Sequence, residues 1–130
     1  DFNISFGNAD YYDGASTSGW QIDNTPSNDM CPPFWWNRFR EDTLFWQKLA
    51  ARWRSARSGV LDEAVISASL DEAVEALSPA IDRNFAKWDI LDSYVWPNAV
   101  YLGSYDKELA YMKKWISGRL DWIDSALEKY

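Results

Sequence analysis

The last quarter of the chain carries the pattern that most restricts the fold. Ser104 or Asp106 is suited to begin a helix there, because both side chains accept hydrogen bonds from free backbone N–H groups. The apolar residues that follow recur at steps of three or four, as on one face of a helix of about six turns: Tyr105, Leu109, Met112, Ile116, Leu120, Ile123 and Leu127. Gly118 lies within this predicted helix. Glycine there costs about 1 kcal/mol relative to alanine and predicts a close approach by another segment.

A second helix is predicted to begin after Asp42 and to end near Arg57, where Gly59 follows. Its apolar stripe consists of Phe45, Leu49, Trp53 and Ala56. This stripe predicts a helix with one face toward the core.

A third helical region is expected from about Leu61, and Ser69 with Glu72 has the spacing of a capping box. Its stripe consists of Leu70, Val74, Leu77, Ile81, Phe85 and Trp88. Pro79 interrupts this stripe and predicts a kink or a break just before it, because proline removes a backbone donor and clashes with the preceding turn.

The rest of the chain is irregular. Residues 1–33 contain turn-forming residues too often for a helix, and only Asp1–Phe6 alternates like a strand. The sequence therefore predicts a mainly α fold in a single domain, with a loop-rich third (1–33) holding one short strand, and a helical portion (34–130) of four to five helices. A chain of this length is expected to bury roughly two-thirds of its unfolded surface in one core.

Composition excludes several kinds of function. The net charge of −7 disfavours nucleic acid as a partner, because binding to phosphates depends on Lys and Arg. No apolar run approaches the roughly 20 residues of a membrane span, and no targeting signal is visible. The chain has no histidine, so His-based catalytic triads and His-ligated metal sites are excluded. No base is present to activate Cys31. Of the usual catalytic side chains, the carboxylates of Asp and Glu are the ones that stay available.

Charge is distributed in blocks. Residues 34–58 hold six basic residues against two acidic ones, whereas residues 59–92 hold two against eight. Two interpretations stay open. Either the basic helix face of the first block packs against or pairs with the acidic block, or the first block forms a basic surface for an anionic ligand, centred on Arg38, Arg40, Arg52, Arg54 and Arg57.

Several short motifs occur in order along the chain. They are Asp1-Phe2-Asn3-Ile4-Ser5-Phe6-Gly7-Asn8, Gly19-Trp20-Gln21, Phe39-Arg40-Glu41-Asp42 with Phe45, Arg52-Trp53-Arg54, Arg83-Asn84-Phe85 with Trp88, and Trp115-Ile116 with Arg119 and Leu120-Asp121-Trp122-Ile123-Asp124. Their order and spacing resemble the C-terminal half of the CotH family of spore-coat-protein-H-like atypical kinases, over nearly the whole chain.

This resemblance implies the C-terminal lobe of a larger α+β kinase-like domain, which phosphorylates protein serine or threonine with ATP and Mg²⁺ or Mn²⁺. It gives Asp1 the metal-binding place of the family's first aspartate, and Asn3 stands where the family commonly has a second one. An amide oxygen also binds a hard cation but brings no charge, so Asn3 puts metal affinity and catalysis in doubt. The resemblance also implies an extracellular, cell-surface or spore-coat location in a bacterium.

In this family the nucleotide-holding lysine, the phosphate-covering loop and the residue that orients the acceptor hydroxyl lie upstream of the aspartate motif. The chain is therefore expected to be an incomplete domain that contains no catalytic residue, binds no cofactor and is inactive alone; its nucleotide-binding residues stay unassigned. The expected partners are the N-terminal half of the same domain and, in the complete protein, a protein substrate. Self-association through an exposed strand of Phe2, Ile4 and Phe6 is also expected.

Two other functions stay open. One is a catalytically dead CotH-like module that binds a protein or a surface, which Asn3 favours. The other is an aromatic carbohydrate-binding domain, with Trp20, Trp35, Trp36 and Trp96 as its stacking residues. Asp10 and Asp13 are interpreted as a solvated turn, since the pattern of a Ca²⁺ loop is incomplete, and Arg83-Asn84 as a buried polar network between helices.

Overall fold

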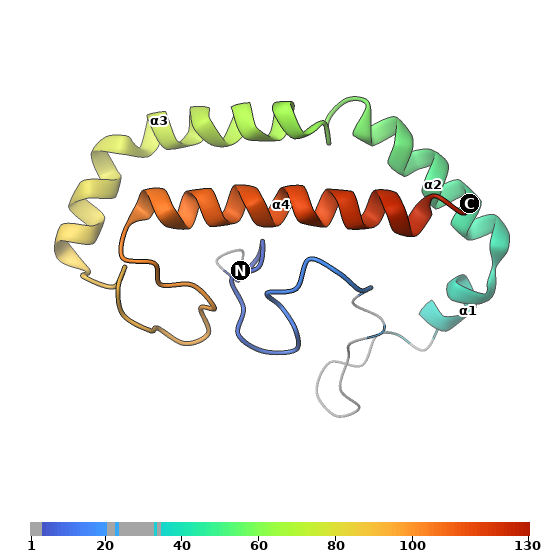
Figure 1. The fold of residues 1–130 in the computed structure, drawn as a ribbon, viewed down its shortest axis with the longest axis horizontal. Helices are drawn as coiled ribbons and strands as arrows, with labels where there is room; N and C mark the ends of the chain where they lie inside the picture. Colours follow the sequence, from blue (N-terminus) through green and yellow to red (C-terminus); the bar gives the residue numbers. More distant parts are fainter. Residues whose placement is uncertain (1–3, 21–22, 24–32, 34) are drawn as a thin grey trace.

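The computed structural model describes residues 4–20, 23, 33 and 35–130, and within this part of the chain the fold is mainly helical (Figure 1). Four helices follow one another: α1 (Trp36–Glu41), α2 (Thr43–Arg57), α3 (Glu63–Lys87) and α4 (Tyr105–Leu127). The predicted fold class is thereby confirmed in its main feature, and the number of helices lies within the predicted range.

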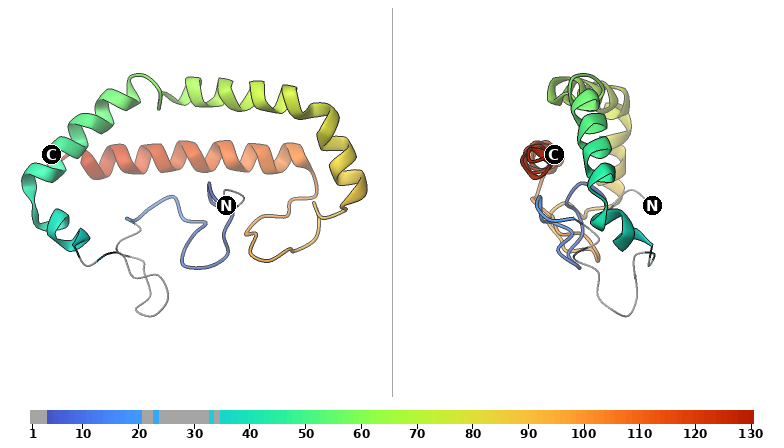
Figure 2. Two further views of the ribbon diagram at one scale, coloured as in Figure 1. Left: turned by 180° about the vertical axis from the view of Figure 1, so that it is seen from behind. Right: turned by 90° about the vertical axis from the view of Figure 1, so that its right-hand side faces the viewer.

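The helices form an arch beside a straight rod. Figures 1 and 2 show α1, α2 and α3 curving along one side of α4, while the N-terminal loop and the connector between α3 and α4 lie along another side. Helix α4 is therefore the element that both halves of the molecule share. None of the helices in the described ranges is both long enough and apolar enough to cross a bilayer.

The predicted starts of α2 and α4 are confirmed by their caps. Asp42 Oδ1 accepts hydrogen bonds from the backbone N–H groups of Leu44 (2.8 Å) and Phe45 (3.3 Å). Ser104 Oγ accepts one from the N–H of Lys107 at 3.4 Å. Each side chain satisfies backbone donors that have no partner inside the first helical turn.

Helix α3 begins near Leu61, as expected, and therefore before the predicted capping box. Asp62 is its N-cap and accepts hydrogen bonds from Ala64 N and Val65 N, so the helix is already formed when it reaches Ser69. Ser69 Oγ instead donates to the carbonyl of Val65 (3.0 Å), as a serine inside a helix does. The capping-box assignment at Ser69 is therefore wrong. The helix continues through Pro79 and bends in the part that contains it (Figure 1), as a proline kink predicts.

The predicted strand Asp1–Phe6 is not supported. Its first three residues lie outside the described ranges, and residues 4–6 form turn structure in which Phe6 has a φ of 54°. No strand occurs elsewhere in the described residues with which this stretch could pair, and an isolated strand leaves its backbone groups without ladder partners. The larger α+β kinase-like lobe is likewise not supported by the described part of the chain.

Side chains from three helices tie the arch to α4. Asp124 on α4 accepts hydrogen bonds from Trp53 Nε1 (2.6 Å) and forms an ion pair with Arg57 (3.0 Å), both on α2. Lys113 on α4 pairs with Asp71 on α3. These contacts explain why Trp53 and Asp124, which belong to the motifs, occur where they do: they fix α2 against α4.

The expected single large core is not present in the described residues. Five apolar residues are buried there, namely Ala9, Ala50, Ile116, Leu120 and Leu127. In the same part of the chain, sixteen large apolar side chains are exposed. The reason is geometric, because an arch beside a single rod covers one side of each helix and leaves the other side open.

The basic block does not pair with the acidic block in the described residues. Arg38 pairs with Glu41, Arg40 with Asp23 and Arg57 with Asp124, and none of these acids belongs to residues 59–92. The ion pairing in the first interpretation is therefore wrong for these arginines, although Arg57 also donates a hydrogen bond to the carbonyl of Leu61 (2.7 Å), which belongs to residues 59–92. The second, a surface for an anionic ligand, stays a prediction.

Candidate functional site

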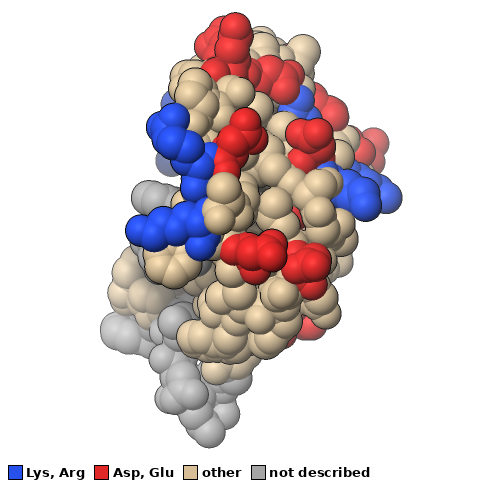
Figure 3. All heavy atoms as spheres, turned by 90° about the vertical axis from the view of Figure 1, so that its left-hand side faces the viewer, with Lys and Arg blue, Asp and Glu red and all other residues tan. Residues whose placement is uncertain are grey.

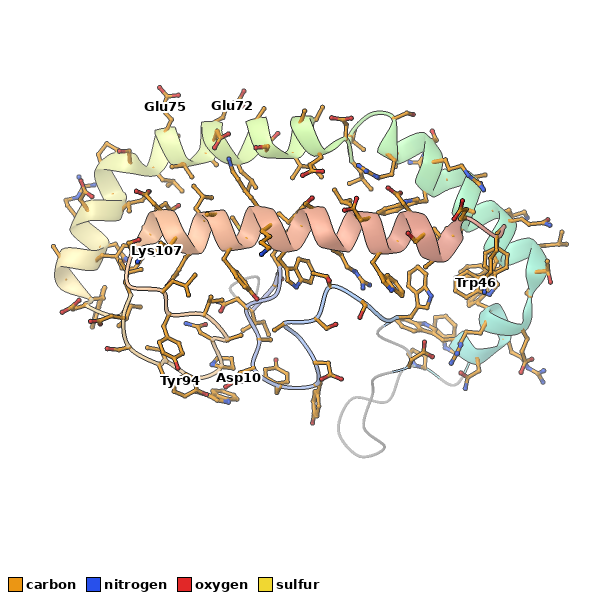
Figure 4. All side chains as sticks on the ribbon, viewed as in Figure 1. Asp10, Trp46, Glu72, Glu75, Tyr94 and Lys107 are labelled. Carbon is orange, nitrogen blue, oxygen red and sulfur yellow. The ribbon has the colours of Figure 1, made fainter. Side chains whose placement is uncertain are left out.

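The candidate site is the loop of residues 4–19 together with the face of α4 against which it lies (Figure 4). Asp1 and Asn3, the predicted metal ligands, and Cys31 lie outside the described residues. The described loop begins at Ile4, the residue that follows Asn3 in the chain.

The Phe6-Gly7 turn packs directly on Trp115. Phe6 and Trp115 meet edge to face, with ring centroids 6.4 Å apart. Gly7 has a φ of 84°, and a Cβ atom added to it would lie 2.3 Å from Cδ1 of Trp115. Both the backbone angle and the contact therefore require glycine at this position.

Three side chains on one face of α4 donate hydrogen bonds to backbone carbonyls of the loop. Tyr111 Oη donates to Gly7 O (3.2 Å), and Trp115 Nε1 donates to Ala15 O (2.9 Å). Arg119 donates to both Thr17 O (3.0 Å) and Gly19 O (2.8 Å). We call Tyr111, Trp115 and Arg119 the α4 clamp. They are spaced four residues apart, which places them one above another on a helix.

Gly118 completes the contact next to the clamp. A Cβ atom at Gly118 would lie 3.2 Å from Cγ2 of Thr17, so the loop approaches α4 closely at this point. The predicted close approach at Gly118 is confirmed.

The loop is also bound to the connector on its other side. Asn8 Nδ2 donates to Asn98 Oδ1 (3.1 Å), and Asn8 Oδ1 accepts from Val100 N (3.3 Å). The N–H of Asp10 donates to Pro97 O at 3.0 Å, and the hydroxyl of Tyr94 donates to the Asp10 carboxylate. The loop is therefore held between α4 and the connector.

Two pockets flank the Phe6-Gly7 turn. One, of about 300 Å³, lies between the loop and α4 and is lined by Asp13, Ser16, Trp115 and Arg119 among others. Burial lowers the pKa of Arg119, whose guanidinium also lies 4.7 Å from the ring of Trp122.

The second pocket, of about 250 Å³, lies behind Phe6 and is lined by Ser5, Asn8, Glu108 and Tyr111 among others. Burial raises the pKa of Glu108, although its carboxylate accepts a hydrogen bond from Leu102 N that acts in the opposite direction. Glu108 is thus a partly desolvated carboxyl group beside the motif loop.

The described residues contain no group of three or more His, Cys, Asp or Glu side chains able to hold a metal ion. The donor set of Asp1 and Asn3 fits a hard divalent cation, because a carboxylate and an amide oxygen are ligands that Mg²⁺ and Mn²⁺ accept. Asp10 and Asp13 are exposed, as predicted for a solvated turn.

Other predicted residues lie apart from this site. Arg83 and Asn84 are exposed near the end of α3, so the buried polar network predicted there is wrong. Trp35 and Trp36 line, with Trp20, an aromatic pocket of about 460 Å³ next to α2, away from Trp96 in the connector. The four tryptophans proposed for carbohydrate stacking are therefore not one surface.

Sequence reasoning found Trp115 and Arg119 through motif resemblance but gave them no role, and it missed Tyr111, Glu108 and the Asn8–Asn98 bond. The spacing of the clamp residues at i, i+4 and i+8 was visible in the sequence. Its significance was not, because the partners are backbone carbonyls about 100 residues away.

The geometry defines a class: a helical scaffold that fixes a short acidic motif loop. The comparison with protein families identifies the family to which this scaffold belongs. The family model described as "CotH kinase protein" matches residues 1–123, and the chain therefore belongs to the CotH kinase family. A search of curated proteins and a search of solved structures found no match.

Proposed function

We propose that the chain forms part of the metal and nucleotide site of an atypical protein kinase that phosphorylates serine or threonine with ATP. One observation carries the proposal beyond family membership. The α4 clamp makes four hydrogen bonds to the loop that follows Asp1 and Asn3. An anchored loop of this kind is what a metal-binding motif needs, because a ligand that moves contributes little to binding.

In this proposal Asp1 and Asn3 hold Mg²⁺ or Mn²⁺. The ion, when bound, neutralises charge on the phosphate oxygens of the nucleotide. The clamp residues act through the backbone: Tyr111 and Trp115 fix the Phe6-Gly7 turn, and Arg119 fixes the end of the loop near Gly19. They are positioning residues and not catalytic ones.

The 130 residues alone are proposed to be inactive, because they contain no glycine-rich loop that could cover phosphates. The proposed partners are the remainder of a kinase domain and a protein substrate, and the proposed location is the spore coat or the cell surface. Appreciable ATP-dependent phosphorylation by the pure 130-residue chain would contradict this part of the proposal.

The direct experiment measures transfer of radiolabelled phosphate from ATP to a serine-containing protein substrate by the full-length gene product. Asp1→Asn is expected to reduce transfer by about tenfold or more, because it removes the only negative charge among the proposed ligands. Glu75→Gln is the control, since Glu75 is an exposed acid on the far side of α3 (Figure 4). Equal phosphate transfer by the wild type and by Asp1→Asn would contradict the proposal.

Asn3 favours a second candidate function, a catalytically dead module that binds a protein or a surface. The variant Asn3→Asp separates the two. If the wild type is inactive and Asn3→Asp restores transfer, the site is that of a kinase that has lost activity. If the wild type is active, the binding-module proposal fails.

A further inference from the structure

The arch formed by α2 and α3 has an outer side that points away from α4 (Figure 1). On α2, Trp53 and Arg57 contact Asp124 of α4 and so mark the inner side of the helix. Helical geometry places Lys48 and Ala51 on the opposite side of α2, and both residues are exposed. This side of α2 therefore faces solvent.

The outer side of α2 is basic. Residues 43–58 hold four basic residues and no acidic one. Of the four, Arg57 pairs with Asp124, and the other three are exposed and form no ion pair with any residue that the structure describes. The acids that precede the helix are engaged elsewhere, because Glu41 pairs within α1 and Asp42 caps α2. We define the α2 face as the three unpaired cations with two exposed apolar residues between them: Lys48, Arg52, Arg54, Leu44 and Ala51.

The first half of α3 is acidic on its outer side. Residues 59–82 hold six acidic residues and no Lys or Arg. Glu72 and Glu75 are exposed, point away from α4 in Figure 4, and form no ion pair within the described part of the chain. In Figure 3 the top of the molecule, along which α3 runs, carries mostly acidic side chains. We define the α3 face by these two acids and the exposed apolar residues beside them: Val65, Ala68, Glu72, Glu75 and Ala76.

The basic residues near α3 lie outside this face. Lys113 and Lys114 belong to α4 and reach α3 from its inner side, where Lys113 pairs with Asp71. Arg83 and Lys87 lie on the last part of α3, beyond Pro79 in the chain. The α3 face thus keeps a single sign, opposite to that of the α2 face.

We propose that the α2 face of one molecule binds the α3 face of a second copy of the chain. Within one chain the two faces cannot meet, because both lie on the outside of the same arch. In a pair of copies, the basic side chains of one pair with Glu72 and Glu75 of the other. Ala51 on one face and Ala68 on the other let the helices approach closely, to about 8 Å between their axes.

The same charges set the orientation of the contact. Two α2 faces or two α3 faces would bring like charges together, so these alternatives are disfavoured. Each molecule keeps one unused face after a single contact, and association can therefore continue beyond a dimer. The contact uses neither the metal motif nor residues 4–6, so its failure would leave the kinase proposal untouched, and the reverse also holds.

The net charge of −7 opposes contact between copies, so the attraction between the two faces acts locally. At about 0.1 M salt the Debye length is about 10 Å, and the distant charges of two molecules are screened more than the pairs in contact. Exposed ion pairs are individually weak. The association is therefore expected to depend on protein concentration and to be lost at high salt.

Sedimentation velocity of the full-length gene product, over a range of protein concentrations, measures this association. In about 0.1 M salt the weight-average sedimentation coefficient is expected to rise with protein concentration, and in about 0.5 M salt this rise is expected to be lost. A coefficient that stays constant in both buffers would overturn the proposal. A rise that salt does not weaken would overturn it as well.

Charge reversal tests whether these two faces make the contact. Lys48→Glu with Arg52→Glu makes both faces acidic, and each molecule of this variant is expected to stay monomeric. Glu72→Lys with Glu75→Lys makes both faces basic and is expected to have the same effect. An equimolar mixture of the two double variants is expected to associate again, because each offers the sign that the other lacks. Association of either variant alone, or none in the mixture, would contradict the proposed faces.

Asp89→Lys with Asp92→Lys is the matched control, because it changes the net charge as much as the α3 reversal but lies on the exposed connector. This control is expected to associate as the wild type does. If it is monomeric, net charge and not the α3 face governs the association, and the proposal fails. A wild type that stays monomeric but binds polyglutamate through Lys48 and Arg52 would assign the α2 face to another acidic partner and would also overturn it.

Discussion

Gly7 is the single residue on which the docking of the motif loop most depends. The backbone there is left-handed, and the ring of Trp115 occupies the space that any side chain would need. Gly103 has nearly the same backbone angle, a φ of 81° against 84°, but nothing lies within 4 Å of where its Cβ would be. Gly7 and Gly103 thus share a left-handed backbone conformation but differ in what a Cβ atom would contact.

Gly7→Ala is predicted to destabilise the fold more than Gly103→Ala. Both variants carry the cost of a left-handed alanine, about 1–2 kcal/mol, and Gly7→Ala adds the displacement of Trp115, about 1–3 kcal/mol for an overpacked contact. Urea unfolding followed by circular dichroism measures the difference. If the two variants lose the same free energy of unfolding, the contact between Gly7 and Trp115 does not stabilise the fold.

Glu108 is predicted to make stability depend on pH. Burial raises the pKa of this carboxyl in the folded chain, so the folded state keeps the proton at pH values where the unfolded chain has released it. The contribution is fully present below the pKa of an unfolded glutamate and is lost as pH rises through the folded value. Glu108→Gln is expected to reduce this fall in thermal stability, because its amide oxygen still accepts from Leu102 N without ionising.

Glu75→Gln is the control for this pH experiment, since it removes an exposed glutamate from α3. A wild type and a Glu108→Gln variant whose melting temperatures follow parallel curves with pH would contradict the assignment.

At the scale of elements, α4 is the organising helix, and the sequence predicted it well. Its cap, its length and its buried stripe of Ile116, Leu120 and Leu127 all follow from local pattern, because a helix satisfies its own backbone. The irregular segments were predicted only as irregular. Their positions depend on single bonds across the fold, such as Tyr111 to Gly7, which no local periodicity encodes.

The capping box at Ser69 and the short strand failed for related reasons, whereas the helical start expected at about Leu61 is confirmed by the N-cap at Asp62. Asp62 and Ser69 can both cap a helix, and Asp62 lies first in the chain, so the helix has already begun when the chain reaches Ser69. Alternation in residues 1–6 suggested a strand, but strand formation requires a partner that the described residues do not supply.

Arg119→Met is predicted to loosen residues 15–19 while leaving the helices intact. The substitution keeps much of the apolar stem and removes the two hydrogen bonds to Thr17 O and Gly19 O. Hydrogen bonds from a charged donor contribute about 1.5–3 kcal/mol, and partial exposure of Arg119 places the expected loss at the lower end of this range, about 1.5–2 kcal/mol. Hydrogen exchange of the loop amides is expected to accelerate relative to that of α4. Arg38→Met is the control, because it removes a highly exposed ion pair within α1. It is expected to change the hydrogen exchange of neither the loop amides nor α4. Unchanged exchange in the loop of Arg119→Met would mean that the clamp does not hold it.

At the scale of the whole molecule, the described residues form an open arch with more large apolar side chains exposed than buried. Family membership over residues 1–123 and the anchored motif loop support the same proposal, a helical support for a metal and nucleotide site. The prediction of self-association stays untested, although residues 4–6 offer no strand for it.

Asp1 and Asn3, with the loop that the α4 clamp holds, are proposed to belong to a metal-dependent nucleotide site. Isothermal titration of ATP into the full-length gene product, with and without Mn²⁺, tests it most directly. We expect ATP binding that requires Mn²⁺, that is weakened about tenfold or more by Asp1→Asn, and that is tightened by Asn3→Asp because a second carboxylate adds charge. Absence of Mn²⁺-dependent binding in both the wild type and Asn3→Asp would contradict it.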